Sequence, residues 1–187
     1  SFVKAEMAMG IPVVFVDRPP VSVDADTVLL DNRGGARRGV MHLIAQGHRR
    51  IGLIADDVDI YTAEQRVEGY HEALESAGID PDESLLRLGC RDVTAAEAAV
   101  TSLLDHPEPP TALFSINNRM SLGALRALHA RSAHLALVGF DDLEFADMIR
   151  TPVTVVSHDP HLMGRMAADV MFQRLGGDKR PPQRIVL

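Results

Sequence analysis

Five polar side chains of this 187-residue chain are of types that bind small polar molecules. An aspartate accepts hydroxyl groups on both oxygens, an arginine donates through a planar fork, and an asparagine does both. Four of the five stand at the end of an apolar run, and the fifth lies near the start of an expected helix: Asp17, Asn117, Asp141, His158 and Arg66. Because ligands of open α/β sheets bind just past the carboxyl ends of the strands, this set predicts a site for a small polar ligand.

Each of these side chains also has a simpler explanation. Asp141 alone would fit a turn or helix-cap aspartate, and Arg66 alone would fit a surface ion pair with Glu64 or Glu68. His158 would fit a strand exit that precedes a helix N-terminus. The five side chains together favour ligand binding more strongly than any one of them does.

Motifs for catalysis, nucleotide binding or metal binding are absent from the sequence. No GxGxxG follows a strand, and neither GxxxxGK[ST] nor GxSxG occurs. The glycines after Arg33 open an expected helix, and no second phosphate-binding feature accompanies them. The eight histidines form no HxxxH or HExxH pair. We therefore expect no cofactor, no metal and no catalytic residues.

Composition is that of a soluble globular protein, with 46% hydrophobic and 24% charged residues. The formal net charge of −7 offers no electrostatic footprint for nucleic acid. No apolar run approaches the roughly 20 residues that a membrane span requires, and no secretory signal is visible. The single cysteine, Cys90, excludes an internal disulfide and fits a reducing compartment.

Strand and helix signals alternate along the chain. Apolar runs predict strands at 13–16, 51–55, 85–89, 111–116, 135–140, 153–156 and 184–187. Periodic apolar positions with capping residues predict helices at 32–46, 62–77, 96–104, 118–130, 145–149 and 160–175. This order is typical of parallel sheets with right-handed crossovers. Only one strand is expected before Asp31, so strand 13–16 and helix 160–175 are assigned to a second, incomplete sheet.

A set of short stretches, in order along nearly the whole chain, resembles the effector-binding core of lactose-repressor/galactose-repressor-type (LacI-type) transcription regulators. The stretches are IPVVFVDRP (11–19), VLLDN (28–32), HLIAQGHRRI (42–51), RVEGY (66–70), PTALF (110–114), MSLGA (120–124), VGFDD (138–142) and PVTVV (152–156). Each motif is modest, and their ordered set is what carries the resemblance.

The resemblance implies a periplasmic-binding-protein-like α/β fold of two Rossmann-like parallel-sheet subdomains, with an effector in the cleft between them. Residues 1–30 and 160–184 would be the remainder of an incomplete N-terminal subdomain. Residues 31–159 and 185–187 would form the C-terminal subdomain, which binds effector and dimerises. The family's helix-turn-helix head would precede Ser1.

The resemblance also implies which residues contact the effector. Residue types that the family uses on its ligands occur at Asp17, Arg66, Asn117 and Asp141. Pocket positions whose identity varies with the effector are occupied by Ile60, Thr62, Arg91 and His158.

Arg91 departs from the family pattern, because an aromatic residue that stacks on a sugar or base often stands there. An unpaired arginine at this position would favour an anionic or strongly polar effector. A local ion pair with Asp92 is the alternative. Two further departures are the Asp56–Asp59 loop in place of a glycine-proline turn, and Asn118 in place of the common aspartate.

From these features we expect the effector-sensing domain of a ligand-responsive DNA-binding transcription regulator, a repressor. It would be cytoplasmic and homodimeric, would bind a small polar metabolite such as a sugar, and would contact operator DNA through a head that this chain lacks. The alternative is a periplasmic sugar-binding protein of a transporter, which shares the fold. A sugar- or nucleotide-processing enzyme is a third and weaker candidate.

Overall fold

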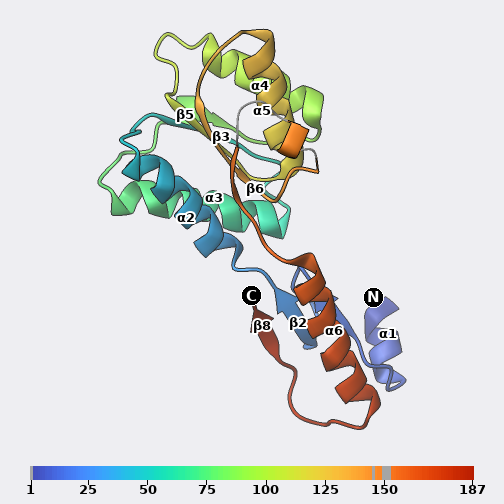
Figure 1. The fold of residues 1–187 in the computed structure, drawn as a ribbon. Helices are drawn as coiled ribbons and strands as arrows, with labels where there is room; N and C mark the ends of the chain where they lie inside the picture. Colours follow the sequence, from blue (N-terminus) through green and yellow to red (C-terminus); the bar gives the residue numbers. More distant parts are fainter. Residues whose placement is uncertain (1, 145, 149–152) are drawn as a thin grey trace. The chain divides into compact units, whose positions relative to one another are not determined.

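The computed structural model describes residues 2–144, 146–148 and 153–187, and the chain divides into two compact units. The first unit comprises Ser1–Asp31 and Asp159–Leu187, and the second comprises Asn32–His158 (Figure 1). Each unit has helices packed on a parallel sheet, so the fold class is α/β, as predicted. None of the helices in the described part of the chain is long and apolar enough to cross a membrane.

The second unit is built on a five-stranded sheet in which all neighbouring strands run parallel. In chain order its strands are β3 (Ile51–Ile54), β4 (Leu86–Arg87), β5 (Ala112–Ser115), β6 (Ala136–Phe140) and β7 (Thr154–Val156). In space the order is β4-β3-β5-β6-β7, so the direction of succession reverses between β3 and β5. This reversal is the switch point of a doubly wound sheet, where such sheets bind their ligands.

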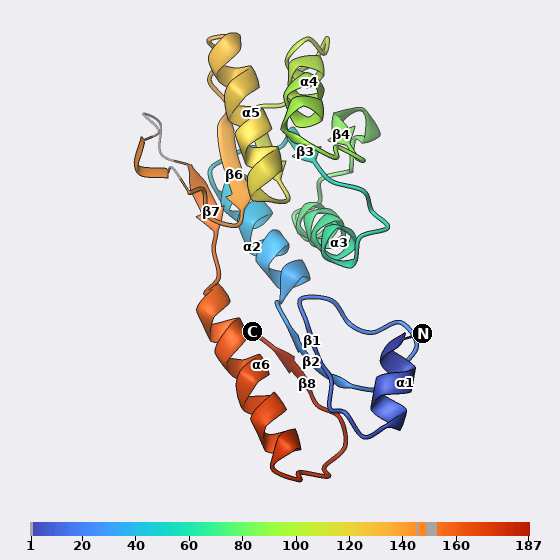
Figure 2. The ribbon, with the colours of Figure 1, turned by 90° about the vertical axis from the view of Figure 1, so that its right-hand side faces the viewer.

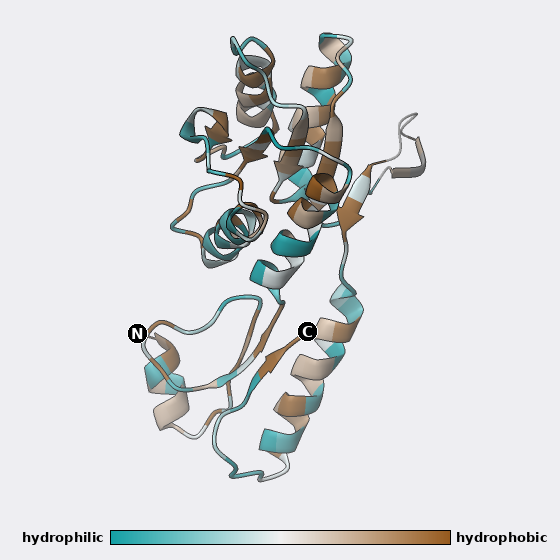
Figure 3. Ribbon diagram, turned by 90° about the vertical axis from the view of Figure 1, so that its left-hand side faces the viewer, coloured by the Kyte–Doolittle hydropathy of each residue, from teal (hydrophilic) through white to brown (hydrophobic). Residues whose placement is uncertain are grey.

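Two pairs of helices cover the two faces of this sheet (Figure 2): α2 (Asn32–Ala45) with α3 (Tyr61–Ser76), and α4 (Val93–Leu104) with α5 (Asn118–Ala130). Strand β6 packs against helices on both faces of the sheet. A Cβ atom at Gly35 of α2 would lie 2.9 Å from the Phe140 ring, and one at Gly139 would lie 2.5 Å from Ser121 Oγ of α5. Successive strand residues point to opposite faces, which explains this alternation. Figure 3 shows the hydrophobic residues concentrated in the strands.

The helix limits follow the local signals closely. Helix α5 begins and ends where the sequence predicts, at 118 and 130. The expected helix at 145–149 corresponds to a 3-10 helix, η2 (Ala146–Met148), and Phe145 and Ile149 lie outside the described residues. A second 3-10 helix, η1 (Glu83–Leu85), precedes β4.

Helices α2 and α3 approach closely because Gly69 has no side chain. A Cβ atom there would lie 2.2 Å from the carbonyl oxygen of Arg33 and 2.9 Å from Cβ of Ala36. A backbone oxygen cannot move aside as the end of a long side chain can, so any larger residue would push the two helices apart. The same approach lets Arg66 of α3 reach Asn32, the first residue of α2.

Gly69→Ala is therefore expected to destabilise the protein by roughly 1–3 kcal/mol, the usual cost of an extra methyl group in a well-packed contact. Glu64→Ala, on an exposed position of the same helix, should change the free energy of unfolding by less than about 0.5 kcal/mol. Urea denaturation measures both variants. A Gly69→Ala protein as stable as the wild type would show that the helices can separate without loss.

The first unit contains a three-stranded parallel sheet in the order β1-β2-β8. Its strands are β1 (Val14–Val16), β2 (Asp26–Leu29) and β8 (Arg184–Val186), and its helices are α1 (Phe2–Ala8) and α6 (Pro160–Leu175). Val28 and Leu30 pack with Met163 of α6 in a small buried core.

Two sequence expectations for this unit need correction, and one helix, α1, had no prediction. A second strand, β2, precedes Asp31, and helix α1 lies before β1. Residues 185–187, expected in the C-terminal subdomain, belong to the first unit, where Ile185 pairs with Val28. Strand β2 begins with two polar residues, Asp26 and Thr27, which are more typical of a turn. For this reason the sequence did not indicate a strand there. A strand as short as β8 carries no local signal of which sheet it joins.

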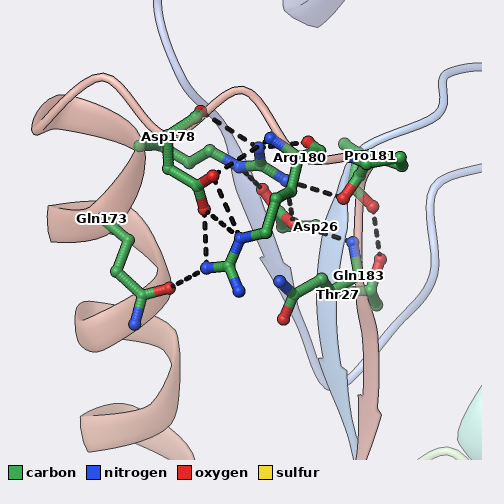
Figure 4. A network of polar contacts seen from close by, with 9 residues as sticks. Asp26, Thr27, Gln173, Asp178, Arg180, Pro181 and Gln183 are labelled. Atoms are coloured by element: carbon green, nitrogen blue, oxygen red, sulfur yellow. Dashed lines mark hydrogen bonds and ion pairs between the residues drawn. The ribbon is translucent and has the colours of Figure 1, made fainter.

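A bidentate ion pair between Arg174 and Asp26 ties the end of α6 to the start of β2 (Figure 4). Nε of Arg174 donates to Oδ2 of Asp26 at 2.6 Å, and Nη2 donates to Oδ1 at 2.8 Å. The backbone N–H of Gln183 donates to the same Oδ1 at 2.8 Å. Further N–H groups of Arg174 bind carbonyl oxygens of the loop before β8, those of Asp178, Arg180 and Pro181. One guanidinium therefore fixes the chain that leads into β8.

The hydrogen bond from Arg174 holds the pKa of Asp26 below its ordinary value. A carboxyl group with a lowered folded pKa stabilises the folded state above its unfolded pKa of about 4, and that stability is lost as the pH falls through the lowered value. Asp26→Asn is expected to lower the melting temperature by several degrees at neutral pH. The difference from wild type should shrink as the pH falls below about 4.

Thermal melts between neutral and acid pH test this expectation. Asp24→Asn, at an exposed aspartate two residues earlier, is the matched control and should follow the wild type. A stability loss in Asp26→Asn that stayed constant through the acid range would contradict the role given to the ion pair.

Candidate functional site

The carboxyl ends of the five strands of the second unit form one edge of its sheet. In the spatial order from β4 to β7, the polar residues that follow the strands are Arg91, Asp56, Asn117, Asp141 and His158. Because neighbouring strands lie about 4.8 Å apart, five strand ends span roughly 19 Å. The edge therefore presents a row of hydrogen-bond donors and acceptors on the scale of a small ligand.

Arg66 carries a buried charge at this edge, with 6% of its surface exposed. Its Nε donates to Oδ1 of Asn32 at 2.8 Å, and its Nη1 donates to the carbonyl oxygen of Ile116 at 2.6 Å. Nη1 also pairs with Oδ2 of Asp141 at 3.1 Å, and Cζ lies 3.7 Å from the centre of the Phe140 ring. A buried charge is tolerated only with such compensation.

The simpler explanation of Arg66, a surface ion pair with Glu64 or Glu68, does not hold. Glu68 instead pairs with Arg33 of α2 at 3.4 Å, and Arg66 pairs with Asp141, 75 residues away in the chain. The structure therefore brings together two of the predicted site residues, Arg66 and Asp141.

Asp141 follows β6 in the left-handed region, with φ at 68°. Few residues other than glycine adopt this conformation, and aspartate and asparagine tolerate it best. Its backbone N–H donates to the carbonyl oxygen of Val156 in β7 at 3.0 Å, which holds the sharp turn. The turn directs the carboxylate of Asp141 at Arg66 on one side and at His158 on the other.

His158 and Asp141 each have one buried polar atom that makes no hydrogen bond among the described residues. These atoms, Nδ1 of His158 and Oδ1 of Asp141, lie 3.5 Å apart. Buried polar groups without a hydrogen bond are costly. A small rearrangement that admitted a ligand hydroxyl would allow it to donate to Asp141 and to accept from His158.

Asp17 belongs to the first unit and repeats the geometry of Asp141. It also follows a strand in the left-handed region, with φ at 68°, and its N–H donates to the carbonyl oxygen of Val28 in the next strand at 2.9 Å. Its participation in one site with the residues of the second unit stays a prediction.

Asn117 caps helix α5 with its side chain, whose Oδ1 accepts the N–H of Met120 at 3.0 Å. The cap occupies the side-chain oxygen, so a ligand would meet the amide NH2 of Asn117. Ile60 is the N-cap residue of α3 and packs against the core, and Thr62 is half-buried in the first turn of that helix. Ligand contact by all three stays a prediction.

Arg91 is paired, but not with Asp92 as the alternative proposed. Its Nη2 lies 3.3 Å from Oδ2 of Asp57, whereas Asp92 caps α4 by accepting the N–H of Ala95. The unpaired arginine that would favour an anionic effector is therefore not what the structure shows.

Two residues of the edge were not predicted as site residues: Arg119, and Asp56, which the sequence analysis noted only as part of the Asp56–Asp59 loop. Asp56 is buried, with 5% exposed, and its Oδ2 accepts from Nη2 of Arg119 at 2.8 Å. A signal was available: Arg119 stands in the first turn of α5, where the helix dipole disfavours a cation unless an acid compensates it.

The glycine-rich start of α2 serves helix packing. Arg33 forms ion pairs with Glu68 and Glu72 of α3, and Gly35 and Gly39 let α2 approach the sheet. This gives the Arg33–Ala36 stretch a role in helix packing. In the described part of the chain, no three His, Cys, Asp or Glu side chains are grouped so that they could hold a metal ion.

A doubly wound sheet whose carboxyl edge carries a buried arginine and a row of polar side chains is an arrangement that α/β domains use to bind small ligands. The chain belongs to the periplasmic binding protein-like domain family, whose model matches residues 40–187.

Similar proteins confirm the predicted resemblance. CelR of Thermobifida fusca, an HTH-type transcriptional regulator, is 37% identical over 185 residues, which are 95% of this chain and 54% of CelR. The ribose operon repressor of Escherichia coli (strain K12) is 29% identical over 181 residues, which are 95% of this chain and 55% of that protein. A solved structure of the transcriptional regulator CelR–cellobiose complex matches with a TM-score of 0.86 at 37% identity, over 95% of this chain and 56% of that one. The chain thus spans about half the length of these relatives.

Two substitutions of Asn117 can separate its role as the cap of α5 from its predicted contact with a ligand. Asn117→Ala removes the cap of α5 and is expected to cost about 1 kcal/mol of stability. Asn117→Asp keeps a capping oxygen and should restore most of that stability, but it removes the amide donor. Ligand affinity should therefore fall in both variants. Affinity that recovers together with stability in Asn117→Asp would show that the residue acts only as a cap.

Proposed function

We propose that this chain is the effector-binding part of a sugar-responsive transcription regulator, a repressor. The observation that carries the proposal is the buried Arg66, which holds Asp141 beside His158 at the carboxyl edge of the sheet. Oxygen acceptors and nitrogen donors grouped in this way suit a ligand with several hydroxyl groups. CelR and the ribose operon repressor are regulators whose names or complexes refer to sugars, which supports the same class of ligand.

Binding would act on DNA affinity by population shift. An effector that binds one state of the regulator more tightly than the other draws the protein into that state, and only this difference in affinity can change the equilibrium. We propose that operator DNA is contacted by a helix-turn-helix head of the kind for which CelR is named. We further propose a homodimer that acts in the cytoplasm without cofactor or catalysis.

The relatives favour a regulator over the solute-binding protein of a transporter, the other function that the sequence predicts. Both classes would share the fold and a ligand site. They differ in whether ligand binding changes affinity for DNA, and this difference provides the decisive measurement.

Ligand binding is tested by isothermal titration calorimetry and thermal shift of the full-length protein with cellobiose, glucose and ribose. A ligand that binds the native state raises the melting temperature as its concentration rises. Asp141→Asn should lower the affinity for the tightest-binding sugar by about 10- to 100-fold, because hydrogen bonds to charged groups contribute roughly 1.5–3 kcal/mol. Arg66→Gln should lower that affinity at least as much.

Arg33→Gln is the matched control, since it removes an arginine with ion pairs on the neighbouring helix, at a side chain that is 50% exposed. It should bind ligand as the wild type does. A mobility-shift assay with the protein's own operator completes the test, and the sugar that binds should change DNA affinity. Sugar binding with no effect on DNA would support the transport function instead.

A further inference from the structure

The half of the sheet edge that β3 and β4 form holds a second set of charges, Asp56, Asp57, Arg91 and Arg119, which we call the switch-point charges. Asp56 follows β3, and Arg119 lies in the first turn of α5, which follows β5. Their ion pair, Oδ2 to Nη2 at 2.8 Å, therefore crosses the point where the strand order reverses. Ligands of doubly wound sheets bind beside this point.

The pair of Asp56 and Arg119 forms the fixed part of the set. The side chain of Asp56 is 8% exposed, and its second oxygen, Oδ1, accepts the N–H of Asp57 at 2.9 Å. Nη1 of Arg119 donates to the carbonyl oxygen of Arg91 at 3.3 Å, so the same guanidinium also holds the turn between β4 and α4. Arg119 is thereby a positioning residue for Arg91.

The pair of Arg91 and Asp57 forms the exchangeable part. The atoms lie 3.3 Å apart, and the two side chains are 81% and 35% exposed. An ion pair this open to water contributes little to stability. A ligand can therefore separate the two side chains at small cost and bind both of them.

Charge balance decides which kind of ligand can separate Arg91 from Asp57 and bind both side chains. The switch-point charges contain two arginines and two aspartates, each arginine paired with one aspartate. An anion that took Arg91 would leave the carboxylate of Asp57 uncompensated beside a second negative charge. A hydroxyl group can donate to Asp57 while a neighbouring hydroxyl accepts from Arg91, which satisfies both side chains.

We propose that the switch-point charges select an uncharged, hydroxyl-rich effector against its phosphorylated or carboxylated counterparts. Arg91 and Asp57 contact the ligand hydroxyls, and Arg119 with Asp56 positions them. The inference rests on the proposed function, because it names the class of effector for that same edge. It reverses the expectation that Arg91 marks an anionic effector.

The test uses matched neutral and anionic probes on the full-length protein: cellobiose against cellobionate, glucose against glucose 6-phosphate, and ribose against ribose 5-phosphate. Calorimetric titration gives the ratio of neutral to anionic affinity for each pair. The wild type should favour the neutral member of the pair that binds by about tenfold or more. Asp57→Asn should reduce that ratio by about tenfold, because it removes the repelling charge.

Asp59→Asn is the matched control for Asp57→Asn. Asp59 is exposed in the same loop and gives its backbone N–H to Oδ1 of Asp57 at 3.2 Å, so the variant removes an equal charge nearby. The ratio should stay close to that of the wild type. An equal drop in both variants would mean that general surface charge, and not Asp57, excludes anions.

The positioning role of Arg119 has its own test, because Arg119→Gln alone would leave Asp56 buried without compensation. The double variant Asp56→Asn/Arg119→Gln restores neutrality and should fold, as a thermal melt verifies. It should lose affinity for the neutral probe and also lose the discrimination between the members of a pair. A purely structural role would lower both affinities alike and keep their ratio.

The outcomes separate the two proposals. A wild type that binds a neutral sugar, with a ratio that Asp57→Asn leaves unchanged, overturns the selection by the switch-point charges and leaves the proposed function standing. A wild type that prefers the anionic probe likewise overturns the selection. A folded wild type that binds none of the six probes overturns the proposed function, and the inference with it.

Discussion

The arrangement of α2, α3, β5 and β6 in the second unit depends on the compensation of a buried charge, the guanidinium of Arg66. Its partners are an asparagine at the start of α2, a carbonyl oxygen after β5 and an aspartate after β6. To supply all three, α2 must lie close against α3, and the glycine at position 69 permits this approach. A guanidinium left without these partners would be far costlier than the hydrogen bonds themselves are favourable. The charge therefore fixes elements that are far apart in the chain.

The three arginines of the sheet edge differ in steps in how far their side chains are exposed. Arg66 is buried and bound on several sides, Arg119 is half-exposed but paired to a buried aspartate, and Arg91 is exposed with a loosely held partner. The most buried pair stabilises the fold, and the most exposed pair is free to exchange with solvent or ligand. Under the proposed selection, substitutions at Arg91 would change specificity, whereas substitutions at Arg66 would disturb the sheet itself.

Local features of the sequence predicted the elements of the second unit well. The start of α5 follows the cap at Asn117. In the first unit, the start of α6 was also predicted, from Pro160 at its first position. The strand ends were also predicted, and with them the side chains of the edge. Unit one was predicted less well, because the polar residues that open β2 are explained only by Arg174, 148 residues away.

Pairings at the edge could not be predicted in the same way. Arg66 meets Asp141 across 75 residues, and Arg91 meets Asp57 across 34, although charged neighbours lie much nearer in the sequence. Which aspartate meets which arginine depends on the spatial order of the strands. Apolar periodicity predicts that strands exist, but it does not encode the order in which they pair. For this reason the pairing of Asp56 with Arg119 was not predicted.

The two covalent links between the units are anchored on both sides. At the first link, the N–H of Asp31 binds the carbonyl oxygen of Leu187, and Asn32 is held by Arg66. At the second, His158 lies against Asp141, and the side chain of Asp159 caps α6. Residues 31–32 and 158–159 therefore belong to ordered elements on each side of both junctions, and neither junction is a free linker.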